Sequence, residues 1–298
     1  MKEQNVKPVI GWIAAGFSIA ITCVWAFWGA IETFHEGWYY ESFIMNMGLA
    51  SLQYLSPMFI FMGVGIISMY WHRVGGVIHI MVALFAAWFF GIFTNAAIIL
   101  IIVPLLGIGL FYWYGSPPSR KIAIRGMIGL PILVALVSGL APAYRVSQRI
   151  TDRNLDAQRV AGNGITLTWA PSGPGWPQEG TNWYKAAQAC QSLSQDGKTV
   201  AYAPPNIWRL PTVEEAVRSM ALHGENSHGV WDSASAIVEY EKGPDKEFPL
   251  WDIYSPIIYW WTATEVDQKN AYIIVYDGKV WPRAKQAVIG NLGFRCVK

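Results

Sequence analysis

Side chains that commonly carry chemistry are few in this chain and do not form a recognisable set. His223 and His228 flank a Gly-Glu-Asn-Ser loop, and no further ligand lies near them in the sequence. A zinc or copper site normally takes three or four converging ligands, so we interpret both histidines as exposed loop residues. Glu239 and Glu241 are interpreted as a solvated edge rather than as an acid–base pair. The sequence therefore predicts no metal and no cofactor.

Several common catalytic motifs and nucleic-acid-binding features are absent from the sequence. The chain contains no glycine-rich phosphate loop, no nucleophile elbow and no His-Glu-x-x-His sequence. It also has no basic stripe and no groove-reading motif of the kind that nucleic-acid-binding proteins carry. We therefore predict a protein that has no catalytic residue and binds no nucleic acid.

Two histidines in the hydrophobic half are the strongest alternative to this interpretation. His72 and His79 are seven residues apart and could share one helix face, as haem or metal ligands do. No second pair accompanies them, so we interpret one as a residue at a span end and the other as hydrogen-bonded inside the bundle. Since ionisable residues are costly within a bilayer and are rare in these spans, a pump or a proton channel is disfavoured.

The three cysteines divide between the two halves of the chain. Cys23 lies in an apolar run, where a thiol behaves as a small hydrophobic side chain. Cys190 and Cys296 are the pair that remains in the second half. An even number of cysteines in a small domain outside the cytoplasm predicts a disulfide between them.

Charge separates the chain into a hydrophobic half and a polar half. Up to Tyr144 there is almost no charge, whereas from Arg145 onward basic and acidic residues are nearly balanced. We predict a transmembrane helical domain at 1–144, a polar stalk at 145–164 and an outer domain at 165–298.

The first half contains five apolar runs that approach the 20 residues needed to cross a bilayer. The runs are 9–34, 43–70, 75–93, 96–114 and 126–142. The second is predicted to bend near Ser56-Pro57, and the third and fourth to form a hairpin at Thr94-Asn95. The fifth is short and contains Pro131. A bundle of about five spans is the predicted fold of this half.

Basic residues of the short connections predict the orientation in the membrane. They all fall on one side of a five-span arrangement: Lys2, Lys7, Arg73, Arg120, Lys121 and Arg125. The opposite connections, 35–41 and 94–95, have neither lysine nor arginine. The positive-inside rule then predicts a bacterial inner-membrane protein with a cytoplasmic N-terminus and a periplasmic or extracellular C-terminal domain.

A cluster of arginines after the last span opposes this orientation. The cluster consists of Arg145, Arg149, Arg153 and Arg159. Asp152 and Asp156 each lie three residues from one of them, so we interpret the stretch as a solvated helix with internal ion pairs.

Local patterns in the second half predict an α+β domain. Alternation predicts a strand at 165–169, and apolar residues at helical spacing predict a helix from Trp183 to Leu193. Thr212 and Glu215 form a capping-box pattern at the start of a second helix. A strand at 271–276 is predicted to turn at 277–278 into a second strand at 279–283, and 294–297 is the final predicted strand.

The order of several residues in the second half resembles the Lcl C-terminal domain family. The resemblance rests on Trp169, Cys190, the run Trp208-Arg209-Leu210-Pro211-Thr212 followed by Glu215, Tyr259-Trp260, Ala271 before Asp277-Gly278, and Phe294-Arg295-Cys296-Val297. It covers 165–298 and implies a fold similar to C-type lectins and formylglycine-generating enzymes. The segment 230–257 departs from the pattern as an insertion.

The resembling motif is interpreted as architecture. Trp208 is expected in the core with Leu210, Arg209 is expected to pair or to reach backbone carbonyls, and Pro211 presets the helix start before its cap. The enzymatic relatives that the resemblance implies need a cysteine pair or a metal site, and this chain has no spare outer cysteine. The resemblance therefore favours recognition over catalysis.

In the resembling fold, ligands are met by the long loops after the second helix. Aromatic side chains of that region, with two basic residues, are the candidate binding surface: Trp231, Tyr240, Trp251, Tyr254, Trp260, Trp261, Trp281, Arg283 and Lys285. Aromatic faces suit both sugar rings and protein contacts.

Two functions follow, both requiring the lipid bilayer as a partner. The first is a structural or assembly subunit that contacts other membrane-protein subunits, which the many glycines of the spans favour. The second is a membrane-anchored module, similar to an adhesin, that binds an outer glycan or polyanion.

Overall fold

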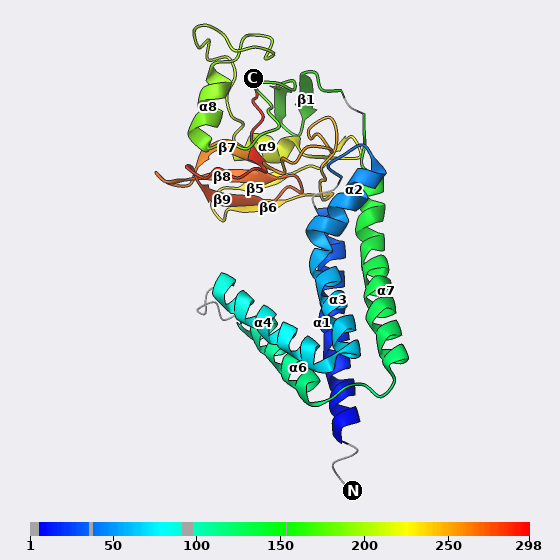
Figure 1. Ribbon diagram of the computed structural model, residues 1–298. Coiled ribbons are helices and arrows are strands. Elements are labelled where there is room, and N and C mark those ends of the chain that lie inside the picture. The colour runs from blue at the N-terminus through cyan, green and yellow to red at the C-terminus, as the bar shows by residue number, and fades with distance from the viewer. Residues whose placement is uncertain (1–5, 36–37, 91–97, 153) are drawn as a thin grey trace. The chain divides into compact units, whose positions relative to one another are not determined.

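The computed structural model describes residues 6–35, 38–90, 98–152 and 154–298. The chain divides into a helical unit, Met1–His35 with Ser42–Tyr144, and a second unit, Glu36–Glu41 with Arg145–Lys298. A helical first half followed by a sheet-containing second half agrees with the predicted fold class at this level (Figure 1).

Apolar helices of 7 to 30 residues make up the helical unit. They are α1 (Val6–His35), α2 (Phe43–Leu49), α3 (Ser56–Tyr70), α4 (His72–Phe90), α6 (Val103–Tyr114) and α7 (Arg120–Ser147), with π-helical turns η2 (Ala50–Tyr54) and η3 (Ile98–Ile102). Helix α7 continues through Pro131 and Pro142 and is 28 residues long, so it extends beyond both ends of the predicted fifth run at 126–142.

Three helices, α1, α4 and α7, are long and apolar enough to cross a membrane. The segments Phe43–Tyr54 and Ser56–Tyr70 meet at a bend of 62° and together make a fourth candidate, which confirms the bend predicted at Ser56-Pro57. Helix α6 has 12 residues and is shorter than a span. The described residues therefore contain up to four spans, and the hairpin predicted at 94–95 lies outside them.

Small residues and methionines fill the interior of the helical unit. Its larger buried cluster contains alanines and four methionines: Met58, Met62, Met69 and Met127. A Cβ atom added to Gly76 would lie 2.7 Å from the carbonyl oxygen of Gly109, so α4 and α6 meet backbone to backbone. Close approach at small residues is the usual way in which membrane helices pack.

The second unit is built on a four-stranded sheet with the order β10-β7-β8-β9. These strands are β7 (Tyr259–Glu265), β8 (Asn270–Val275), β9 (Val280–Ala284) and β10 (Leu292–Gly293). Two short helices, α8 (Trp183–Gln191) and α9 (Val213–Ser219), precede the sheet, and three hairpins complete the unit: β1 (Gln158–Gly162) with β2 (Ile165–Trp169), β3 (Ala221–Leu222) with β4 (Glu225–Asn226), and β5 (Val230–Asp232) with β6 (Ile237–Glu239).

Most of the local predictions for this unit are confirmed. Strand β2, helix α8, the capping box of Thr212 with Glu215 and the β8–β9 hairpin all form. The final strand is different, because only Leu292–Gly293 pairs as a strand. Val297 instead makes isolated bridges to Trp169 and Arg209.

Residues 145–164 are part of the folded second unit and not a free stalk. Helix α7 ends at Ser147, and β1 pairs along its whole length with β2. Helix α7 ends before Asp152, and the predicted pairing of Arg149 with Asp152 is wrong, because Asp245 accepts hydrogen bonds from Arg149 Nη2 (2.9 Å) and Arg145 Nε (3.0 Å). The charge of Arg149 is therefore buried against a carboxylate 96 residues away in sequence. The other predicted pair involves Arg153, which lies outside the described residues.

Candidate functional site

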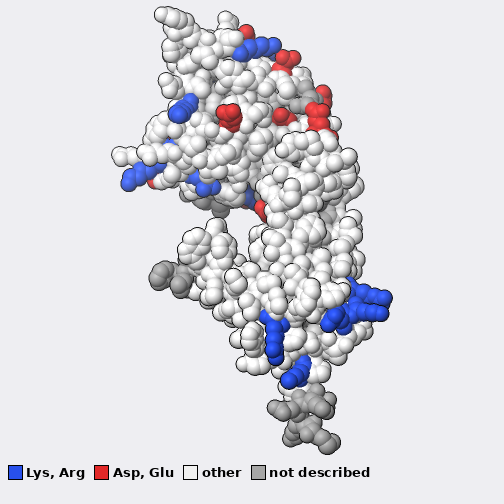
Figure 2. Space-filling model, in the orientation of Figure 1, with Lys and Arg blue, Asp and Glu red and all other residues white. Residues whose placement is uncertain are grey.

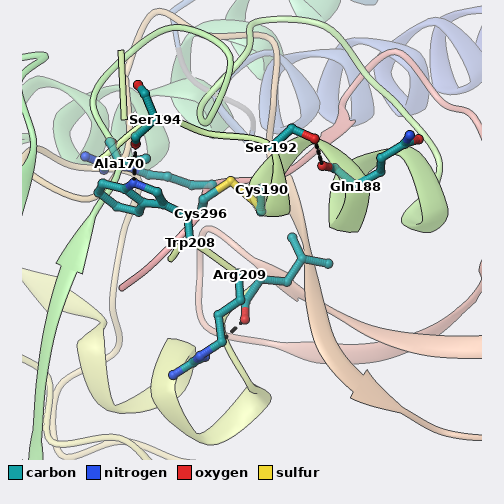
Figure 3. The surroundings of a disulfide bond; sticks show 10 residues. Ala170, Gln188, Cys190, Ser192, Ser194, Trp208, Arg209 and Cys296 are labelled. Carbon is teal, nitrogen blue, oxygen red and sulfur yellow. Dashed lines mark hydrogen bonds between the residues drawn. A yellow bond between two sulfur atoms is a disulfide. The ribbon is translucent and has the colours of Figure 1, made fainter. Parts of the chain in front are cut away.

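A disulfide joins Cys190 at the end of α8 to Cys296 near the end of the chain, as predicted (Figure 3). The loop that it closes spans 106 residues of sequence separation. By the chain-entropy argument, a loop of this length contributes on the order of 4 kcal/mol to stability. The bond therefore braces the unit, and neither of these sulfur atoms is a free thiol.

The Trp208–Thr212 run is partly buried and is held by hydrogen bonds within the second unit. Trp208 is buried, and its indole Nε1 donates to the carbonyl oxygen of Ser194 at 2.9 Å (Figure 3). Arg209 donates to both carboxylate oxygens of Glu215, at 2.7 and 2.6 Å. Leu210 and Pro211 are also buried.

Electrostatics fix the start of α9. Glu215 accepts the backbone N–H of Thr212 at 2.8 Å while Thr212 accepts the backbone N–H of Glu215. Burial raises the pKa of Glu215, but the hydrogen bonds from Arg209 and Thr212 outweigh it and leave that pKa below its usual value. The hydrogen bonds between these residues hold the first turn of α9 in place.

Four members of the candidate binding surface lie in the interior, and the prediction is wrong for them. Trp251, Trp260 and Trp261 are fully buried, and the rings of Trp251 and Trp260 stack with centroids 3.6 Å apart. Lys285 is buried, with its Nζ on a carboxylate oxygen of Glu265 and 4.9 Å from the Trp183 ring centroid. Apolar clusters cover both faces of the sheet, so strand alternation could not reveal which tryptophans are exposed.

Three more members of that surface are half-buried and face inward. Trp231 packs edge to face on Tyr272 with centroids 5.4 Å apart. Tyr240 donates its hydroxyl to the carbonyl oxygen of Gly278 at 3.0 Å, and Tyr254 packs against the core around Trp260. The segment 230–257 is thus folded into the unit, with β5 and β6 at its start and Trp251 in the core.

The remaining two members are close together on β9. Trp281 is 41% exposed, and its ring lies 6.2 Å from that of Tyr259 on β7. Arg283 is two residues further along the strand, on the same face, and its Nε atom is buried without a hydrogen-bond partner among the described residues. We call Tyr259, Trp281 and Arg283 the β9 shelf, a surface with two aromatic side chains and one half-buried cationic side chain.

The two loop histidines do not converge on a metal site. His223 Nδ1 lies 3.3 Å from a carboxylate oxygen of Glu247, which is buried, and burial raises the pKa of that carboxyl group. His228 is exposed. Within the described residues, no group of three or more His, Cys, Asp or Glu side chains is placed to hold a metal ion.

Sequence reasoning missed two features of this unit. Arg295 is fully buried, donates to the carbonyl oxygens of Ala170 and Pro249, and lies 3.7 Å from the Trp176 ring centroid. In the sequence Arg295 is notable only as part of the Phe294–Val297 motif, and nothing there indicates that its side chain is buried. The second feature is an exposed, mostly apolar loop at 199–207. The sequence signals of this loop are two adjacent prolines, a tyrosine and the absence of charged residues.

Comparison with family models, curated proteins and solved structures gives no match for this chain.

Proposed function

We propose that the chain is a non-catalytic integral membrane protein that acts as a structural or assembly subunit, with its second unit as a recognition domain. The observation that carries the proposal is the open surface of the long helices. In the most apolar 18-residue stretch of each helix, only 33% of α1, 28% of α4 and 22% of α7 is buried within the chain. A Cβ added at Gly16, Gly63 or Gly107 would meet nothing within 4 Å. Such small, unoccupied positions are where another membrane helix can approach.

The charge distribution supports a cytoplasmic N-terminus and a periplasmic or extracellular second unit in a bacterial inner membrane. Lysine and arginine side chains gather at one end of the helical unit, while its middle is uncharged (Figure 2). At that end the Lys7 carbonyl lies against Gly115, and Arg120 lies over the Tyr70 ring. Since Arg145 and Arg149 are paired with Asp245, they oppose the positive-inside rule less than their number suggests.

A C-type-lectin-like fold of the Lcl C-terminal type is part of the same proposal. Three features support it: two short helices before a mixed, mainly antiparallel sheet, a disulfide from the first of these helices to the end of the chain, and the buried Trp208–Thr212 run. The β1–β2 hairpin pairs residues of the predicted stalk with the domain, and the compact second unit includes the chain from Arg145 onward.

Purification from native membranes tests the assembly function. Full-length protein extracted in a mild detergent is expected to retain one or more membrane proteins at fixed molar ratio, measured by quantitative mass spectrometry. A chain that elutes alone at every detergent concentration that preserves its fold would contradict the proposal.

The β9 shelf supports a second candidate function, recognition of an anionic outer glycan. Trp281 and Tyr259 offer stacking faces, and the half-buried side chain of Arg283 beside them supplies a positive charge for an acidic group. Full-length protein in nanodiscs would be screened against neutral and acidic glycans, with Trp281→Ala as the test variant and Tyr184→Ala as the matched exposed control. Binding that survives Trp281→Ala would exclude the shelf.

A further inference from the structure

The exposed loop at 199–207 combines apolar side chains with a rigid base. Val200 is 61% exposed, Ile207 is 42% exposed and Tyr202 is fully exposed, and Ala203 to Pro205 between them are also exposed. No charged residue occurs between Lys198 and Arg209. Solvent-exposed apolar patches of this kind mark interaction sites more often than ordinary surface does. In Figure 1 the chain makes this excursion beyond the end of α8.

The two ends of the loop are held together beside the disulfide. The backbone N–H of Ala201 donates to the carbonyl oxygen of Ser192 at 2.7 Å, and that of Asn206 donates to Gln191 at 3.2 Å. Both acceptors directly follow Cys190. The next anchor is Trp208, which is buried. The loop therefore projects from a fixed base.

The tip of the loop is also pre-organised. Two prolines, Pro204 and Pro205, restrict its backbone, and Asn206 adopts a left-handed φ of 55° while its side-chain amide donates to the carbonyl oxygen of Pro204. A tip that is ordered before binding loses less conformational entropy when it docks. An exposed tyrosine on such a tip has the features of an interface hot spot.

We propose that the loop at 199–207 is the docking element of the second unit, and that Tyr202 inserts into an uncharged, apolar groove on a protein partner. This proposal rests on the assembly function and names the surface that carries it. The partner must be uncharged at the groove because the loop offers no counter-charge to it. A polyanion is excluded by the same argument.

The backbone of the tip favours a protein over a bilayer as the occupant. No backbone–backbone hydrogen bond joins residues 202–205 to any other described residue. Inserting unpaired peptide groups into hydrocarbon is costly, whereas a protein groove can supply donors and acceptors. Residues 199–207 also contain no tryptophan, a residue that commonly anchors segments at a membrane surface.

Site-specific photo-crosslinking in native membranes tests the proposal. A photoreactive phenylalanine analogue at position 202 is expected to crosslink to the protein that co-purifies at fixed ratio. The same analogue at Tyr184, which is exposed on α8 of the same unit, is expected to give no such product. A product with lipid alone, or with a second copy of this chain, would overturn the proposal.

A substitution separates this proposal from the assembly function. Tyr202→Ser is expected to lower the recovered partner ratio by about tenfold or more, while Tyr184→Ser leaves it unchanged. Formation of the Cys190–Cys296 disulfide in each variant checks that the unit has folded. If wild type and Tyr202→Ser retain the partner equally, docking by the loop is wrong and the assembly function stands. If wild type purifies alone, the assembly function is wrong and the docking proposal falls with it.

Discussion

Tryptophan occupies opposite places in the two units of this protein. In the helical unit, several tryptophans are exposed: Trp12, Trp28, Trp71, Trp88 and Trp113. In the second unit the largest fully buried side chains are tryptophans: Trp169, Trp176, Trp208, Trp251, Trp260 and Trp261. The difference shows that the burial of a tryptophan depends on the solvent that surrounds the unit. Water drives large aromatic surfaces into a core, whereas lipid offers no such drive and leaves helix contacts to small residues.

This contrast explains why a tryptophan count was a poor guide to a binding surface. The chain has 16 tryptophans, and those of the second unit were the main reason for predicting a broad aromatic surface there. Three of them, Trp251, Trp260 and Trp261, form core contacts instead. Only the β9 shelf, with Trp281, remains from that prediction as an exposed feature.

The largest expected effect comes from truncating a core tryptophan. Trp260→Ala should destabilise the second unit by about 4 kcal/mol, because it leaves a cavity beside Trp251 and Trp169. Trp88→Ala in the helical unit should cost less than about 1 kcal/mol, since that ring is exposed. Near-UV circular dichroism during urea unfolding of the full-length protein measures both. Equal losses in the two variants would break the comparison.

A buried charge should rank next. Asp245→Ala removes the partner of Arg149, whose side chain is 3% exposed, and should cost about 3 kcal/mol. The exposed pair of Asp156 with Lys198 is the matched control, and Asp156→Ala should change stability by less than about 1 kcal/mol. The same unfolding measurement applies. A stable Asp245→Ala protein would show that Arg149 reaches water when its partner is lost.

The stability of the helical unit should be more sensitive to enlarging a small residue at a helix contact than to truncating an exposed side chain. Gly76→Val places a side chain against the backbone of Gly109 and should cost about 2 kcal/mol by forcing α4 and α6 apart. Gly63→Val is the control, because a Cβ there meets no atom within 4 Å. Thermal unfolding in a mild detergent distinguishes them. A larger loss for Gly63→Val would instead indicate that another chain occupies that face.

The smallest expected effect is a pH dependence at the start of α9. The pKa of Glu215 is depressed, so its ionised form stabilises the unit above the unfolded-state pKa of about 4.3, and this contribution is lost as pH falls through the folded-state pKa. Wild type should therefore lose more stability than Glu215→Gln between about pH 5 and pH 3. Glu214→Gln, at an exposed position, should follow wild type. If the stability of wild type and of Glu215→Gln falls equally with pH, Glu215 does not cause the pH dependence.

Local interactions could be predicted from the sequence, and distant ones could not. The capping box of Thr212 with Glu215, the turn at Asp277-Gly278 and the bend at Ser56-Pro57 each depend on residues that are neighbours in the chain. The pairing of Arg149 with Asp245 depends on a contact across 96 residues, and no local pattern signals it. The disulfide was the exception, because only two cysteines of the second half could pair.

The assignment of Glu36–Glu41 to the second unit has a consequence for the timing of synthesis. Within that segment the Tyr39 ring faces the ammonium group of Lys246, with 5.8 Å between the Nζ atom and the ring centroid. About 200 residues separate the two, and ribosomes add roughly 5–20 residues per second. On the order of 10–40 s therefore pass between the synthesis of Tyr39 and the synthesis of Lys246. During that interval α1 and α2 have already been synthesised. The second unit can be completed only after α7, the last helix of the helical unit, has also been synthesised.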